Sequence, residues 1–330
     1  MKNFDFVAVG DTTIDAFIRI KEASVNCDLN RENCKICFGF ANKIPYESVT
    51  IVPAVGNSAN AAVCAARLGL RSAFVGNVGD DQNGKDCIKA FQANNVNTDF
   101  IKINKGKKTN YHYVLWYEDE RTILIKHEEF DYTMPDINSP KWLYLSSLGE
   151  NSLAFQHETA EYLKERPAIN LAFQPGTFQM KFGLENLKSI YELSKVFICN
   201  LQEAQRILKT DIKIPLELMK MVRSKGPKIV VITDGPRGAY TYDGDNAWFM
   251  PPYPDPKPPF ERTGAGDAFS STFVAALAMD KTIEQALMMA PINSMSVVQK
   301  IGAREGLLTL PEIEKYLQQA PEDYKAKKII

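Results

Sequence analysis

The residues best suited to chemistry lie in the segment Arg262-Thr263-Gly264-Ala265-Gly266-Asp267. Its three small residues leave backbone N–H groups uncovered, and the apolar run from Ala268 to Met279 predicts that a buried helix starts there. A helix N-terminus carries unpaired N–H groups, so these small residues are expected to form an anion hole. Asp267 is then a candidate general base toward a hydroxyl group. The combination suits phosphoryl transfer from ATP to an alcohol; the alternative is an aspartate that only caps the helix.

A second polar set is predicted to hold the hydroxylated acceptor. Gly56 and Asn57 form a turn, and Asn60 follows on the first turn of a helix. Asp11 and Asp15 come just after the first strand, and a carboxylate that accepts two hydroxyl hydrogens is well suited to a sugar ring. The alternatives are helix capping by Asn57 or Ser58 and a solvated turn for the two aspartates.

The nucleotide end is predicted from two strand ends. Asn200 and Glu203 are spaced for a hydrated Mg²⁺ site, and equally for an N-cap with a capping-box glutamate. Thr233 ends a strongly apolar strand, and Gly235 and Gly238 after it would let a nucleotide approach closely. Neither a P-loop nor a dinucleotide fingerprint occurs in the sequence.

Bulk composition excludes several classes of protein. Lys and Arg total 39 against 40 Asp and Glu in 330 residues, with no basic tail, so nucleic acid is not an expected partner. No apolar run has the length of a membrane span, and no secretory signal is evident. The six scattered cysteines suit reduced thiols in a cytoplasmic protein. Cys27, Cys34 and Cys37 are expected to be free thiols, with a structural zinc as the alternative.

Strand and helix patterns alternate along the chain, which predicts βαβ units and a mostly parallel sheet. Ligands bind beyond the carboxyl ends of the strands in such sheets. Residues 16–52 and a hairpin within 109–127 break the alternation, and we expect them to form a small β lid. No low-complexity linker divides the chain, so residues 1–330 are expected to fold as one domain.

Taken together, the chain resembles the ribokinase-like (PfkB) family of carbohydrate and nucleoside kinases. The resemblance covers nearly the whole sequence. It is carried by Thr263-Gly264-Ala265-Gly266-Asp267, by the segments from Gly56 to Gly69 and Val75 to Gly84, and by the Asn200–Glu203 spacing. It implies a three-layer α/β/α fold, ATP and Mg²⁺, and a lid that often pairs across two subunits.

The resemblance also implies roles for particular residues. Asp267 would be the base, while Asp15, Gly56 and Asn60 would contact the sugar. Asn293 would flank the adenine.

Two departures from the family pattern stand out. Val55 replaces the first glycine of a usual pair. Glu261 stands where the family often has an aspartate that helps hold a monovalent cation, so K⁺ activation through Glu261, Thr263 and Gly302 is in doubt.

The acceptor is left open between a sugar or nucleoside, which we favour, and a sugar phosphate. A nucleobase would need an apolar wall, and a phosphate would need cations. The lid offers candidates for both: for the wall, Phe17, Phe38, Phe40, Tyr111, Tyr113 and Trp116; for the cations, Lys43, Lys107, Lys108, Arg121 and Lys126. The alternative to an enzyme is a catalytically silent sugar-binding protein.

Overall fold

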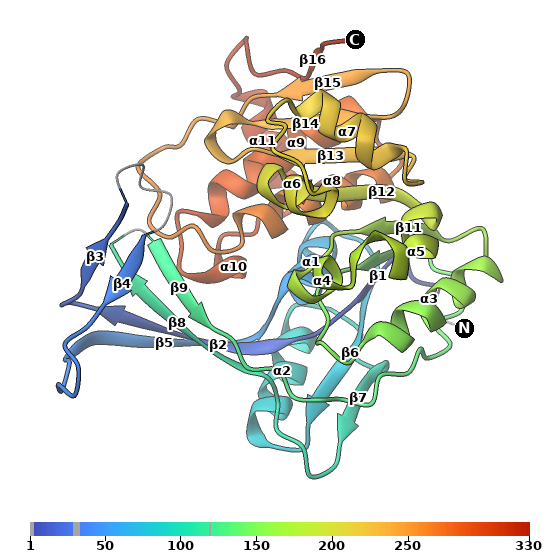
Figure 1. The fold of residues 1–330 in the computed structure, drawn as a ribbon. Coiled ribbons are helices and arrows are strands. Elements are labelled where there is room, and N and C mark those ends of the chain that lie inside the picture. Colours follow the sequence, from blue (N-terminus) through green and yellow to red (C-terminus); the bar gives the residue numbers. More distant parts are fainter. Residues whose placement is uncertain (1–2, 29–33, 119) are drawn as a thin grey trace.

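The computed structural model describes residues 3–28, 34–118 and 120–330, and its centre is a large twisted sheet (Figure 1). The strand order is β16-β15-β14-β13-β12-β11-β10-β1-β6-β7, parallel from β7 through β13 and antiparallel from β13 to β16. The strands are β1 (Phe6–Val9), β6 (Ser72–Gly79), β7 (Ile101–Asn104), β10 (Trp142–Leu145), β11 (Asn170–Phe173), β12 (Ser194–Asn200), β13 (Ile229–Thr233), β14 (Ala239–Tyr242), β15 (Ala247–Met250) and β16 (Lys327–Lys328).

Helices cover both faces of this sheet, because successive strand residues point to opposite sides. On β1, Phe6 and Ala8 enter one hydrophobic core, while Val7 and Val9 enter the other. The first core is closed by α1 (Asn57–Arg67), α2 (Gln82–Ala93), α8 (Ala265–Ala278), α9 (Ile283–Val297) and α11 (Leu310–Gln318). The second is closed by α3 (Leu153–Lys164), α4 (Thr177–Asn186), α5 (Lys188–Leu193), α6 (Leu201–Leu208) and α7 (Pro215–Arg223). The expected three-layer α/β/α architecture is confirmed.

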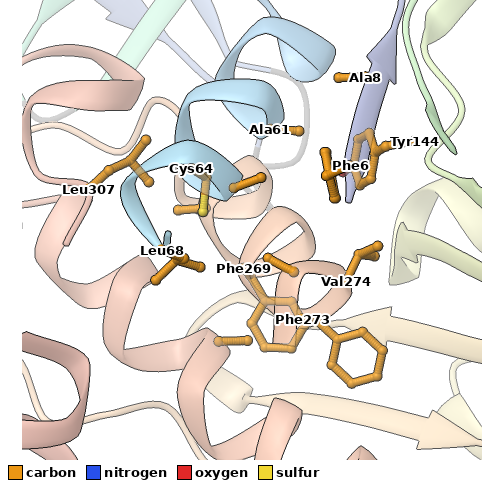
Figure 2. Close-up of a cluster of buried hydrophobic side chains, with 14 of the residues drawn as sticks. Phe6, Ala8, Ala61, Cys64, Leu68, Tyr144, Phe269, Phe273, Val274 and Leu307 are labelled. Atoms are coloured by element: carbon orange, nitrogen blue, oxygen red, sulfur yellow. The ribbon is translucent and has the colours of Figure 1, made fainter. Parts of the chain in front are cut away.

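The first core fixes the relative position of α1 and α8. Figure 2 shows side chains of both helices, among them Cys64 and Phe273, packed together with Phe6 of β1 and Tyr144 of β10. Phe273 is fully buried. Since the N-termini of α1 and α8 carry the predicted acceptor and base residues, this packing positions the site.

The lid is a four-stranded sheet of order β5-β2-β8-β9 that projects from the central sheet (Figure 1). Its strands are β2 (Thr13–Ile20), β5 (Tyr46–Val55), β8 (Tyr111–Tyr117) and β9 (Glu120–Leu124). Strands β2 and β8 are parallel, whereas the other pairs are antiparallel. The expected lid segments thus supply most of these strands, although residues 29–33 and 119 lie outside the described part.

Two elements differ from the sequence-based expectation. The ten-residue strand β5 lies in a segment in which we found no period. Its outer residues are exposed and its last ones buried, so neither alternation nor a continuous apolar run marks it. The sequence pattern of residues 184–193 predicts one helix, whereas the structure divides this segment between α4 and α5.

The expectation of free thiols is wrong for Cys27 and Cys34, which form a disulfide. A short hairpin of β3 (Ser24–Asn26) and β4 (Lys35–Cys37) brings their Cα atoms within 4.0 Å, a pairing that sequence spacing alone does not reveal. Bonded sulfurs are not thiolate ligands, and the described residues contain no metal-binding group of His, Cys, Asp or Glu, so the zinc alternative fails. Cys37, Cys64, Cys87 and Cys199 are free. None of the described helices combines the length and hydrophobicity needed to cross a bilayer.

We predict that Phe273→Ala lowers the free energy of unfolding by about 3–5 kcal/mol, because it leaves a cavity between α8 and the sheet. Urea denaturation followed by circular dichroism measures the change. Phe40→Ala is the matched control, since that ring is 98% exposed and its loss should change the free energy by less than about 0.5 kcal/mol. Equal effects of the two changes would contradict this account of the core.

Candidate functional site

A cleft of about 1140 Å³ opens where the carboxyl ends of the parallel strands meet the lid. Five strands place a residue at or just beyond their last position on its wall: Asp11 after β1, Ser147 after β10, Gln174 after β11, Asn200 on β12 and Asp234 after β13. This is the edge at which parallel α/β sheets bind ligands. The cleft therefore gathers residues that are widely separated in sequence.

The small-residue segment forms the start of α8 at the floor of the cleft. Gly264 is the N-cap with φ of 82°, and a Cβ there would come within 2.4 Å of the Ala303 backbone, so only glycine fits. Ala265 and Gly266 begin the helix and line the cleft. The first N–H groups of a helix have no intrahelical acceptor, which makes this end suitable for an anion.

Asp267 is not the cap of this helix; it lies inside the first turn, and its carboxylate accepts three side-chain amide hydrogen bonds. Asn60 Nδ2 donates to Oδ2 at 2.8 Å, while Asn57 Nδ2 and Gln174 Nε2 donate to Oδ1 at 2.9 and 3.3 Å. The amides come from α1 and from the end of β11. They fix the orientation of the carboxylate toward the cleft, which Asp267 lines.

The environment of Asp267 acts on its pKa in two directions. The side chain keeps some solvent contact through the cleft, yet protein atoms enclose it closely. This desolvation raises the pKa above the usual value for an aspartate, while the amide hydrogen bonds and the charge of Arg121 lower it. The raising effect is the larger, so the carboxylate is a stronger base than an exposed one.

The residues at the start of α1 that were expected to bind the acceptor make hydrogen bonds within the protein. Gly56 is the N-cap without a side-chain cap bond, and Ser58 Oγ donates to the Val9 carbonyl at 2.7 Å, so helix capping by Asn57 or Ser58 does not occur. Asn57 and Asn60 bind Asp267. Asn60 Oδ1 is buried and has no hydrogen-bond partner in the described part of the chain, so it retains an acceptor for a ligand.

Asp11 and Asp15 line the cleft together with two lid histidines that sequence reasoning missed. Asp11 accepts from Tyr132 Oη at 2.9 and 3.0 Å and lies 3.0 Å from His127 Nδ1. His112 Nδ1 is 3.4 Å from Asp15 Oδ1. The alternation along β8, in which Tyr113 is exposed and Val114 buried, was the signal that places His112 on the inner face.

At the nucleotide end, Asn200 and Glu203 form a reciprocal capping box. Asn200 Oδ1 accepts from the Glu203 N–H at 2.8 Å, and Glu203 Oε2 accepts from the Asn200 N–H at 2.9 Å. Both line the cleft, and burial raises the pKa of Glu203, with the charge of Asp267 adding to the effect. A carboxylate next to another carboxylate in a cleft suits a nearby cation.

The turn after β13 also faces the cleft. Thr233, Gly235 and Gly238 line it, and a Cβ on Gly238 would meet the Met250 carbonyl at 2.4 Å. Arg237 closes the turn through two bonds to Asp234, at 2.6 and 2.7 Å.

Asn293, which the resemblance placed beside the adenine, lies in the protein interior. Its side chain is fully buried, where Nδ2 donates to Thr272 Oγ1 at 2.8 Å and Oδ1 accepts from the Leu308 N–H at 2.9 Å. Both ends of the amide are thus used inside the protein. The neighbouring Ser294 and Met295 of α9, rather than Asn293, line the cleft.

The expected monovalent-cation region is occupied by internal contacts. Glu261 is fully buried; its carboxylate accepts from the Thr263 N–H at 2.7 Å, from the Thr263 hydroxyl and from the Gly302 N–H at 3.3 Å. The Arg121 guanidinium lies 3.8 Å away. A fixed positive charge beside this carboxylate disfavours a further cation, so the residues present do not fit K⁺.

Few of the lid residues proposed to recognise a nucleobase or a phosphate line the cleft. Of the six aromatic residues named above, all within the described part of the chain, none lines it. Of the five cations, only Arg121 does, and Lys126 instead pairs with Glu128 at 3.0 Å.

Comparisons with known proteins identify the family of this chain. Residues 21–310 match the family model described as pfkB family carbohydrate kinase. An uncharacterized sugar kinase of Archaeoglobus fulgidus is 26% identical over 248 residues, which cover 73% of this chain and 96% of that protein. A ribokinase of Bacillus subtilis is 27% identical over 271 residues, covering 79% of this chain and 87% of the relative.

Solved structures show the same fold. Arabidopsis thaliana ribokinase, complexed with ribose and ATP, superposes with a TM-score of 0.78 at 20% identity, covering 96% of this chain and 99% of that one. A nucleoside kinase of Methanocaldococcus jannaschii gives a TM-score of 0.75 at 17% identity, covering 95% and 98%. The chain therefore belongs to the pfkB family of carbohydrate kinases and has the ribokinase-like fold.

Proposed function

We propose that this carbohydrate kinase transfers the γ-phosphate of ATP to a hydroxyl group of a free sugar, with Asp267 as the general base. The observation that carries the proposal is the position of the Asp267 carboxylate. Three amides orient it, and it stands in the first turn of α8, where unpaired N–H groups can bind a phosphate. A hydroxyl bound beside it would pass its proton to the carboxylate while its oxygen attacks phosphorus.

The far end of the cleft suits the nucleotide. Thr233, Gly235 and Gly238 would accommodate ATP, and the backbone of Gly264, Ala265 and Gly266 would hold the transferring phosphoryl group. Glu203 would hold a hydrated Mg²⁺ bound to the phosphates, because its half-buried carboxylate lines the cleft, where burial and the charge of Asp267 raise its pKa and a cation would stabilise its ionised form. When bound, that ion would neutralise phosphate charge.

The acceptor is narrowed by what faces the cleft. Among the described lid residues on its wall, the apolar ones are Ile123 and Ile125, none of the six aromatic residues that could stack on a nucleobase is present, and the one cation, Arg121, is already next to Glu261. Asp11, Asp15 and Asn60 supply hydroxyl acceptors instead. A neutral sugar is therefore favoured over a nucleoside or a sugar phosphate, and the intact base argues against a catalytically silent protein.

The outer face of the lid supports a proposal about assembly. Val49 and Ile51 of β5 share one face and are 43% and 59% exposed, and Leu124 of β9 is 51% exposed. Both strands are edges of the four-stranded sheet. Apolar edge strands usually pair or are covered, so we propose that a second copy of the chain docks here.

Asp267→Asn should lower kcat about 10²–10⁴-fold while ATP still binds. In the unchanged enzyme, kcat should fall with acidification at a pH above the usual aspartate range, because the base works only when ionised and its pKa is raised. Steady-state kinetics and calorimetric titration with ATP measure these effects. Near-normal turnover by the variant would remove Asp267 as the base.

Stability provides the control for that variant. Because the pKa of Asp267 is raised in the folded protein, its protonated carboxyl group adds stability at low pH. That stability is lost as the pH rises through the folded-state pKa, so ionised Asp267 lowers the free energy of unfolding at pH 8. Asparagine relieves this cost, and the unpaired Asn60 Oδ1 can turn to accept from the new amide. The melting temperature of Asp267→Asn at pH 8 should therefore not fall below that of the unchanged protein.

The acceptor itself is tested by a panel of D-ribose, D-fructose, adenosine and fructose 6-phosphate with ATP and Mg²⁺. We expect kcat/KM for a free sugar to exceed the values for the last two by at least about 100-fold, the range that one or two unsatisfied polar contacts produce. A preference for adenosine or the phosphosugar would overturn the proposed acceptor. No turnover with any compound would favour the silent protein.

Assembly is tested by Ile51→Glu, which places a charge on the exposed face of β5. The change should shift the sedimentation coefficient from that of a dimer to that of a monomer. Ile214→Glu is the control, because that isoleucine is 54% exposed on the body of the protein. A monomeric unchanged protein at micromolar concentration would refute docking through the lid.

A further inference from the structure

Two imidazole–carboxylate pairs lie side by side at the acceptor end of the cleft. His127 is held by Asp11 at 3.0 Å, and His112 faces Asp15 at 3.4 Å. The two rings are 5.3 Å apart between centroids. Asp11 is further fixed by Tyr132, whereas Asp15 has no other partner among the described hydrogen bonds. The mechanism proposed above uses neither histidine.

Sheet register fixes one pair. Strand β8 runs parallel to β2, and His112 is the direct cross-strand partner of Asp15. Neighbouring positions on one face of a sheet hold their side chains in contact, so this histidine does not depend on a loop for its place. It lies on the lid, while Asp267 lies on the body.

Among the described residues, three buried polar atoms at this end make no hydrogen bond: His112 Nε2, Asn60 Oδ1 and Asp15 Oδ1, the last of which lies 3.4 Å from His112 Nδ1 as an ion-pair contact only. All three residues line the cleft. Buried polar groups are normally paired, so orphaned atoms that converge on a cleft mark groups reserved for a ligand.

The chemistry of these atoms defines what they can bind. A carboxylate and an amide oxygen only accept hydrogen bonds. In a neutral His112 whose Nδ1–H faces Asp15, Nε2 is also an acceptor. Three acceptors together require hydrogen-bond donors, which the hydroxyl groups of a sugar supply.

We propose that His112 is a specificity-determining residue that accepts a hydrogen bond from a hydroxyl group of the sugar. His127, held by Asp11, positions the His112 ring from the lid. The inference rests on the proposed function and refines it: the acceptor is a neutral polyol that presents hydroxyl donors to the lid as well as to the body. The lid thereby contributes to substrate specificity, in addition to excluding water from the site.

Imidazole NMR tests the contact directly, because the chain contains only three histidines. The third, His157, is bonded to the Asn186 carbonyl on the surface and is the internal reference. Titration with the free sugar of highest kcat/KM in the panel should shift the signals of His112 and His127 and leave His157 unchanged. Saturating sugar that leaves the His112 signal unmoved would overturn the proposal.

Substitution gives an independent test. His112→Ala should raise KM for that sugar about 10–100-fold, while KM for ATP stays within twofold, because a buried sugar hydroxyl loses its acceptor. His112→Gln, whose amide oxygen can accept, should recover part of the loss. His157→Ala is the matched control, and circular dichroism checks folding of each variant.

Deoxy analogues of the sugar locate the contact. One monodeoxy analogue should be a poorer substrate for the unchanged enzyme but no worse than the parent sugar for His112→Ala, since the contact is already gone. If every analogue loses the same factor in both proteins, His112 acts only on folding or lid packing and the proposal fails. Normal sugar turnover with such a result leaves the proposed kinase function standing, so the two failures are distinguishable.

Discussion

The site depends on one carboxylate and the three amides that hold it. Asn57 and Asn60 approach Asp267 from α1, and Gln174 approaches from the end of β11. This geometry exists only while α1 and α8 pack on the same face of the sheet, as the core around Phe273 makes them do (Figure 2). Enclosure by the same elements raises the pKa of Asp267, so packing sets both the place and the basicity of this group.

The cleft has two chemically different ends on either side of this carboxylate. Toward β12 and β13 it presents backbone turns and Glu203, which suit phosphates and a cation. Toward β1 and the lid it presents acceptor groups, two of them backed by histidines. Arg121 reaches from the lid to Glu261 beside the start of α8, so the lid contacts the phosphate end as well. A lid with contacts at both ends is suited to couple binding of the sugar to closure over the reacting groups.

Local patterns predicted much of the fold. The strands of the parallel sheet are short apolar runs, and α8 is an uninterrupted apolar helix, so sequence period and helix-start chemistry located them. Strand β5 was not predicted because its outer half faces solvent and its inner half contacts the body, so its hydrophobic pattern has no single period. The disulfide between Cys27 and Cys34 was not predicted because it depends on the register of a hairpin whose two strands have three residues each.

The sequence by itself indicated the carbohydrate kinase family, because small residues before an aspartate at a helix start restrict what that point of the chain can do. It also placed Asn60, Glu203 and Thr233 at element ends that converge on one edge of the sheet. Only the tertiary structure decided their partners: that Asn60 binds Asp267, that Asn293 is buried in the core, and that His112 and His127 line the cleft. Side-chain pairing depends on packing and strand register between distant segments, and neither is encoded in local spacing.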